Sequence, residues 1–255
     1  MTSAELKSFL DSKYDQFNRP DFIGPDPVSI PHQFSLKEDI EISGLLAATI
    51  AWGQRITIIN NANKMMKLMG NSPYDFIMSA SEKDLKRFDS FVHRTFNGTD
   101  MIFFLRSLRN IYSVHKGLES AFDQKECKAA IMNFRSLFFS IEHPKRTEKH
   151  VSNPEENSSA KRLCMYLRWM VRKDKRGVDF GIWDSRLKPA ALMCPLDVHT
   201  GNVGRALGLL KRTQNDWKSV EELTASLRKL DPKDPVKYDF SLFGLGVFEN
   251  FTGTR

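Results

Sequence analysis

Lys161 supplies an amine and Asp197 supplies a carboxylate, and each residue lies at the start of an expected helix. Lys161 opens a helix over about 160–173, where the helix dipole and the neighbouring Arg162 favour an uncharged amine. An uncharged lysine is a nucleophile that forms Schiff bases with carbonyl carbons. Asp197 precedes an apolar helix pattern over 198–210, and as its N-cap it would accept hydrogen bonds from first-turn amides. The two side chains could therefore perform nucleophilic chemistry with electrostatic support.

The stretch that carries the aspartate, PLDVHTGNVGRALGLL at 195–210, resembles the aspartate-bearing helix of the helix-hairpin-helix DNA glycosylases. In that superfamily a proline, an apolar residue, Asp, Val and His precede an apolar helix, and the aspartate is catalytic. The glycines of this stretch, Gly201, Gly204 and Gly208, predict close approach of another backbone, because glycine otherwise weakens a helix interior.

A second match lies at 157–161, where the superfamily has Gly, an apolar residue, Gly, any residue and the catalytic lysine. This chain reads Asn157, Ser158, Ser159, Ala160, Lys161, so the lysine matches and both glycines are replaced. The spacing from the lysine to the aspartate is closest to that of the archaeal 8-oxoguanine branch of the superfamily.

The resemblance implies an all-α fold of two helical lobes with a cleft between them, and a DNA N-glycosylase with AP lyase activity. Lys161 would attack the sugar C1′ of an extruded nucleotide, giving a Schiff base and then strand cleavage by β-elimination. Asp197 would stabilise the cationic sugar and help deprotonate the lysine. Further DNA contacts would come from His199, Asn157, Ser158 and Ser159.

The helix over 160–173 also shows a cationic side. Leu163, Leu167 and Met170 form one apolar stripe, while Lys161, Arg168 and Arg172 fall on the opposite side. We expect Arg168 and Arg172 to contact DNA phosphates, and the alternative is an ordinary solvated charged face.

Three residues are candidates for a base pocket, namely Trp52, Gln54 and Trp183. An extruded base needs an aromatic stacking surface and hydrogen bonds to its edge. Large aromatic residues are also common in protein cores, so the two tryptophans have that second interpretation.

The composition is that of an ordinary globular chain of 255 residues with 41% apolar residues. Lys and Arg outnumber Asp and Glu by 38 to 31, and the net charge of +7 is compatible with a polyanionic partner such as DNA. The three cysteines are far apart and not at metal-ligand spacing, so we expect reduced core thiols, no metal and no cofactor. No signal peptide or membrane span is recognised, and we expect a monomeric cytoplasmic protein.

The chain is organised as a series of helices and loops, with no defensible strand pattern. Ser35 and Glu38 form a capping-box pattern before IEISGLLAATIAW, which is apolar on nearly all sides and is expected to be the central buried helix. We expect one compact unit, residues 1–255, of two packed lobes. The central lobe is 36–142, and the other combines 1–35 with 143–255.

The segments YDQFNRPDFIGPDPVSIPHQF and DIEISGLLAATIAWGQR also resemble an uncharacterised bacterial family, known only as a domain of unknown function, over essentially the whole chain. The glycosylase resemblance covers mainly residues 155–247. Two alternatives to the enzyme remain: a non-catalytic DNA-binding module of the same fold, which the missing glycines suit, and a helical protein-interaction protein.

Overall fold

The computed structural model describes residues 1–251, and these are mostly helical, so the predicted all-α class is confirmed. The α-helices are α1 Ser3–Phe17, α2 Lys37–Thr49, α3 Arg55–Leu68, α4 Pro73–Ser79, α5 Glu82–Leu85, α6 Gly98–Val114, α7 Leu118–Ala121, α8 Cys127–Phe138, α9 Lys161–Val171, α10 Val198–Ala206, α11 Trp217–Leu230 and α12 Tyr238–Val247. Short 3-10 helices are η1 Pro20–Phe22, η2 Pro27–Ser29, η3 Pro31–Gln33, η4 Lys86–Phe88, η5 Lys145–His150, η6 Pro154–Glu156, η7 Pro189–Ala191 and η8 Pro235–Lys237.

A small hairpin interrupts the helices. Strands β1 (Val92–His93) and β2 (Phe96–Asn97) are antiparallel, with Val92 opposite Asn97 and His93 opposite Phe96. Strands of two residues are too short to show an alternating pattern, which is why the sequence did not predict them. No helix in the described part of the chain is long and apolar enough to cross a membrane.

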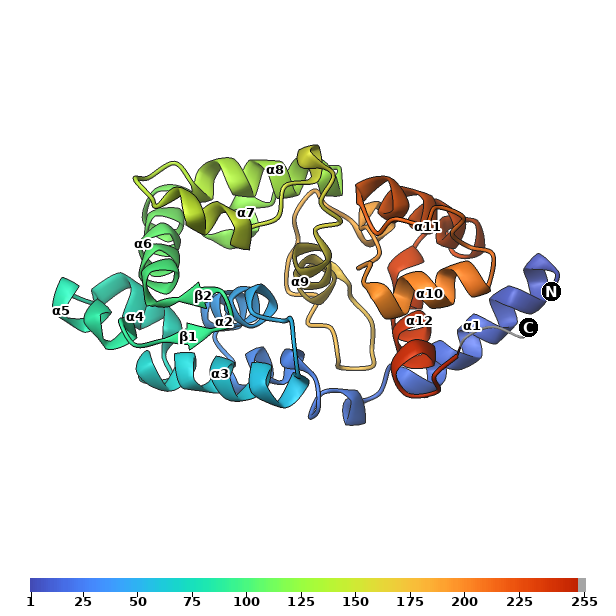
Figure 1. Cartoon of the computed structure of the whole chain (residues 1–255), viewed down its shortest axis with the longest axis horizontal. Coiled ribbons are helices and arrows are strands. Elements are labelled where there is room, and N and C mark those ends of the chain that lie inside the picture. The colour runs from blue at the N-terminus through green and yellow to red at the C-terminus, as the bar shows by residue number, and fades with distance from the viewer. Residues whose placement is uncertain (252–255) are drawn as a thin grey trace.

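Helix α9 stands near the middle of the molecule (Figure 1). Helices α2 to α8 lie on one side of it in this view, and α1 and α10 to α12 lie on the other. Helix α9 contacts α2, while α12 contacts both α1 and α10. Helix α9 thus lies between two groups of helices, and α1 packs with the C-terminal helix α12 although it begins the chain.

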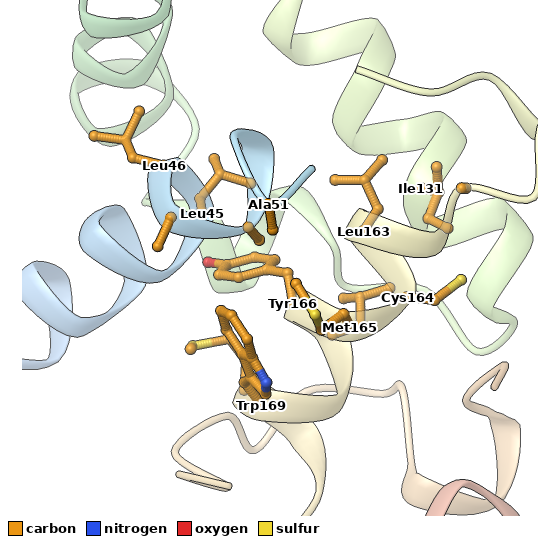
Figure 2. Packing of buried hydrophobic residues seen from close by; sticks show 14 of the residues in the cluster. Leu45, Leu46, Ala51, Ile131, Leu163, Cys164, Met165, Tyr166 and Trp169 are labelled. Carbon is orange, nitrogen blue, oxygen red and sulfur yellow. The ribbon is translucent and has the colours of Figure 1, made fainter. Parts of the chain in front are cut away.

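Helix α2 is buried on almost all sides, as the sequence predicted. Every residue from Ile40 to Thr49 is buried. Gly44 permits the approach of α9, because a Cβ at this position would lie 3.2 Å from Met170 Cε. In Figure 2, Tyr166 of α9 points toward Leu45 of α2, and its hydroxyl donates to the carbonyl oxygen of Glu41 at 3.1 Å.

The start of α2 differs from the capping-box prediction. The N-cap is Leu36, which makes no side-chain cap, so Ser35 lies one residue too early to serve. Glu38 and Asp39 occupy the first turn instead, where carboxylates interact favourably with the helix dipole. The prediction of a cap at Ser35 was wrong, although the helix itself forms.

Two buried arginines, Arg168 in the last turn of α9 and Arg172 directly after the helix, bind acidic residues of the irregular segment 172–196 and of the region from Asp234 to α12. Arg168 Nη1 donates to Asp239 Oδ2 at 2.8 Å, and its Nη2 lies 3.3 Å from Asp179 Oδ1. Arg172 Nη1 donates to Asp179 Oδ2 at 2.9 Å, and its Nε to Asp234 Oδ2 at 2.9 Å. Arg172 is 1% exposed, so these charges are removed from water and depend on each other.

Replacement of Arg172 by Met should destabilise the fold strongly, because it leaves carboxylates buried without their cation. We expect the free energy of unfolding in urea to fall by about 3 kcal/mol or more. The matched control is Arg186→Met, which removes an exposed guanidinium from its pair with Asp123 and should change the same quantity by about 1 kcal/mol at most. Equal losses in the two variants would contradict a structural role for the buried arginine.

Candidate functional site

A cavity of about 530 Å³ lies where α3, α9, α10 and α12 approach each other. Its walls also include residues of η1 and η2, the α2–α3 junction, and the turn before α9. The volume is in the range of sites that hold a small molecule or a single nucleoside. We refer to it below as the cavity.

Lys161 and Asp197 face each other in the cavity. Lys161 Nζ lies 3.5 Å from Asp197 Oδ2, and the two side chains are 26% and 23% exposed. Asp197 is the N-cap of α10, and its Oδ1 accepts a hydrogen bond from the amide of Thr200 at 2.9 Å. One carboxylate oxygen is therefore anchored to the helix, and the other is available to the lysine. An amine beside a proton acceptor in an open cavity can act as a nucleophile.

The turn before α9 forms without glycine. Asn157 (φ 61°) and Ala160 (φ 47°) adopt the left-handed conformation that glycine usually supplies, and asparagine tolerates it better than most residues. Ser158 Oγ accepts a hydrogen bond from the amide of Ala160 at 3.3 Å, but no side chain caps α9 itself. Ser158 and Ser159 line the cavity, whereas Asn157 is exposed and lies outside the lining.

Trp52 lines the cavity and is half-buried. The guanidinium of Arg162 lies 4.7 Å from the centre of its ring, and His150 stacks near it at 6.1 Å. Arg162 also donates to the carbonyl oxygens of Thr49 and His150, which fixes it in place. Gln54 is exposed at the N-cap position of α3 and is not part of the lining.

Trp183 belongs to the core, so its assignment to a base pocket was wrong. It is 6% exposed, and its Nε1 donates to Glu41 Oε1 at 2.6 Å. Its ring packs against Phe122 and Tyr166. The segment 172–196 folds back over α2 and α7 and carries this residue away from the cavity.

Arg168 and Arg172 are likewise not exposed phosphate contacts, and this prediction was wrong. The helical spacing correctly placed both residues on one side of α9. That side packs against α12 and the segment 172–196, whose acidic side chains Asp239 and Asp179 pair with the guanidiniums. Arg168 is one of the residues that line the cavity, but it is 3% exposed and is paired with Asp179 and Asp239.

Asp239 also lines the cavity, although the sequence analysis did not predict it as a site residue. It lies in the first turn of α12 and is 6% exposed. Burial raises the pKa of Asp239 to about 7, more than Arg168 lowers it, and the charge of Asp197 raises it further. A carboxylate inside the apolar run YDFSLFGLGV was the available signal, because an apolar helix seldom buries a charge without a reason.

Asp26 and Phe243 also line the cavity, although the sequence did not indicate them as site residues. Asp26 is buried, and its Oδ1 accepts the amide of Val28 as the N-cap of η2. Burial raises the pKa of this carboxyl. The cavity therefore combines aromatic walls with carboxyl groups that burial shifts toward the protonated form.

The start of α10 packs closely on α12. A Cβ on Gly246 would lie 3.0 Å from His199 Cβ, so the close approach occurs at a glycine of α12. Gly204 instead faces the Leu223 side chain, and Gly208 (φ +72°) follows the end of α10, which stops at Ala206 rather than Leu210. His199 itself is exposed and lines the cavity.

The cysteines are free and buried, as predicted. Within residues 1–251, no group of three or more His, Cys, Asp or Glu side chains is arranged to hold a metal ion.

A family model described as "Protein of unknown function (DUF2400)" matches residues 26–248. This agrees with the whole-chain resemblance seen in the sequence. No curated protein and no solved structure matches the chain.

The raised pKa of Asp239 predicts a pH-dependent stability. Between about pH 4 and pH 7 the folded protein holds a proton that the unfolded chain releases, so this group's contribution to stability falls as pH rises. The Asp239→Asn variant has no carboxyl group to titrate at this position, so its free energy of unfolding should not fall in this way. For one full proton the fall approaches about 1.4 kcal/mol per pH unit. Urea unfolding across this range measures the difference. The exposed Asp89→Asn serves as control, and parallel pH profiles for wild type and Asp239→Asn would refute the assignment.

Proposed function

We propose that this chain, which belongs to the DUF2400 family of proteins of unknown function, is a DNA base-excision enzyme. It would release a damaged base and then cleave the strand through a lysine Schiff base. The observation that carries the proposal is the 3.5 Å approach of Lys161 Nζ to Asp197 Oδ2 in the cavity. The resemblance of both local sequences to the helix-hairpin-helix glycosylases supports it.

In the proposed reaction, Asp197 accepts a proton from the lysine. The free amine of Lys161 then bonds to C1′, the C1′–N bond to the base breaks, and the base leaves with the electron pair and takes up a proton. The sugar ring opens at the C1′–O4′ bond, O4′ takes up the proton that Asp197 holds, and the protonated Schiff base remains on Lys161. Asp197, ionised again, then accepts a C2′ proton, and the C3′–O3′ bond breaks with its electron pair leaving on the 3′ phosphate, which cleaves the strand.

The cavity has the groups that an extruded nucleotide requires. Trp52 and Phe243 offer aromatic surfaces for the base, and Asp239 offers a carboxyl group for its edge. The uncapped first turn of α9, with Ser158 and Ser159, leaves backbone amides for a phosphate. His199 at the start of α10 is exposed to make a second phosphate contact.

The proposal includes a helix-hairpin-helix glycosylase-like arrangement of two lobes, 36–142 and 1–35 with 143–255. The first lobe contributes Ala51, Trp52, Gly53, Arg55 and Ile58 to the cavity, and the second contributes residues of α9, α10 and α12. A cleft between lobes would admit a strand of DNA along its length.

A second candidate function is a DNA-binding module without catalysis. The replacement of both hairpin glycines by Asn157 and Ser159 favours it. The ion pair between Lys161 and Asp197 is compatible with it as a structural contact between α9 and α10.

Borohydride trapping on a duplex with an abasic site, and on one with 8-oxoguanine, distinguishes the two functions. Lys161→Gln should abolish the covalent adduct, because the adduct is the stable amine that borohydride forms from the iminium between Lys161 and C1′. Asp197→Asn should bind DNA as wild type does and slow base release by about 100-fold or more. Asparagine is chosen since it can still cap α10.

The control for trapping is Lys173→Gln, an exposed lysine just beyond the other end of α9. It should give the wild-type yield of adduct. Wild-type protein that binds both duplexes and traps neither would overturn the enzyme and leave the binding module. An adduct that persists in Lys161→Gln would assign the nucleophile elsewhere.

A further inference from the structure

Three exposed apolar side chains belong to, or directly follow, residues that line the cavity. Ile56, Val198 and Phe248 are 70%, 63% and 47% exposed. Val198 lines the cavity, and the other two each follow a lining residue, Arg55 and Val247. They come from α3, α10 and the end of α12, so segments remote in sequence each bring an exposed apolar side chain within one residue of the cavity lining. Exposed apolar surface that gathers at a cavity marks a place of contact with a partner.

Arg55 lines the cavity and lies against two aromatic rings. Its guanidinium carbon lies 5.3 Å from the ring centre of Phe243 and 5.6 Å from that of Phe248. Burial raises the pKa of Asp26 in the same cavity, and the charge of Arg55 is one of three that lower it, but among residues 1–251 the two side chains form no ion pair. Stacking on two rings orients the guanidinium and leaves its N–H groups free for an anion, for which phosphate is the natural partner.

We propose that this mouth, defined as Arg55, Ile56, Val198 and Phe248, binds an unpaired stretch of nucleic-acid strand beside the cavity. Contact with the face of a base would bury the exposed apolar side chains, which is favourable. Base faces are accessible only where a strand is unpaired or unstacked. Arg55 would bind the adjacent phosphate. The net charge of +7 complements such a strand. The inference rests on the proposed function and narrows its substrate to nucleotides next to unpaired bases.

Fluorescence anisotropy with labelled oligonucleotides tests the mouth apart from the chemistry. Each probe carries a tetrahydrofuran abasic analogue, which has no aldehyde. The first probe is a single strand, the second is a duplex with mismatches beside the analogue, and the third is a fully paired duplex. Wild-type protein should bind the first two more tightly than the third. Phe248→Ala should weaken binding to the unpaired probes by about 10-fold or more and change binding to the paired duplex little.

Matched controls separate the mouth from general surface effects. Leu36→Ala removes an apolar side chain of almost equal exposure, 48%, at the start of α2, and should leave all affinities unchanged. Arg55→Gln should reduce the slope of log affinity against log salt by about 0.7 on single strands, while Lys67→Gln near the other end of α3 should not. Phe248→Trp keeps an aromatic surface and should restore binding if the ring is what matters.

Equal binding of paired and unpaired probes, or a Phe248→Ala variant that behaves as Leu36→Ala does, overturns the inference. Neither result depends on Lys161, since the probes cannot form a Schiff base. Conversely, failure of borohydride trapping would remove the proposed chemistry while the preference for unpaired strands could still be measured. If the protein bound none of the oligonucleotides but bound an apolar peptide at this mouth, both the inference and the proposed function would be overturned.

Discussion

The mutual neutralisation of Arg168 and Arg172 with buried carboxylates is the constraint on which the rest of the structure depends. Asp179 touches both guanidiniums, so the segment 172–196 cannot leave α9 without exposing an unpaired charge inside the protein. Asp239 ties α12 to α9 in the same way. Since α12 packs on α10, this one network fixes three of the helices that surround the cavity.

The proposed chemistry of the cavity then depends on helix ends rather than helix sides. Lys161 is the first residue of α9, and Asp197 is the N-cap of α10. Helix termini present unsatisfied backbone amides, which favour anions nearby and anchor the carboxylate through Thr200. The convergence of two helix N-termini on one cavity therefore brings the amine of Lys161 and the carboxylate of Asp197 together.

The sequence predicted local features well and the packing of irregular segments poorly. The cap at Asp197, the buried α2 and the shared location of Lys161 and Asp197 follow from local patterns and from the resemblance. Helical spacing showed that Arg168 and Arg172 share a side, but not that the segment 172–196 covers it. The same segment carried Trp183 into the core. A segment without periodicity gives no information about what it covers, and the burial of its neighbours could not be predicted.

The family match begins at residue 26, but the folded unit begins earlier. Tyr14 of α1 accepts a hydrogen bond from Arg172 Nη2 at 2.7 Å, and Asn18 donates to Asp174 Oδ2, which itself pairs with Arg172. Leu10 of the same helix is fully buried, and Ser241 of α12 donates to its carbonyl oxygen. The boundary of shared sequence is thus not a boundary of cooperative folding, and a fragment cut at residue 26 would open the central ion-pair network to water.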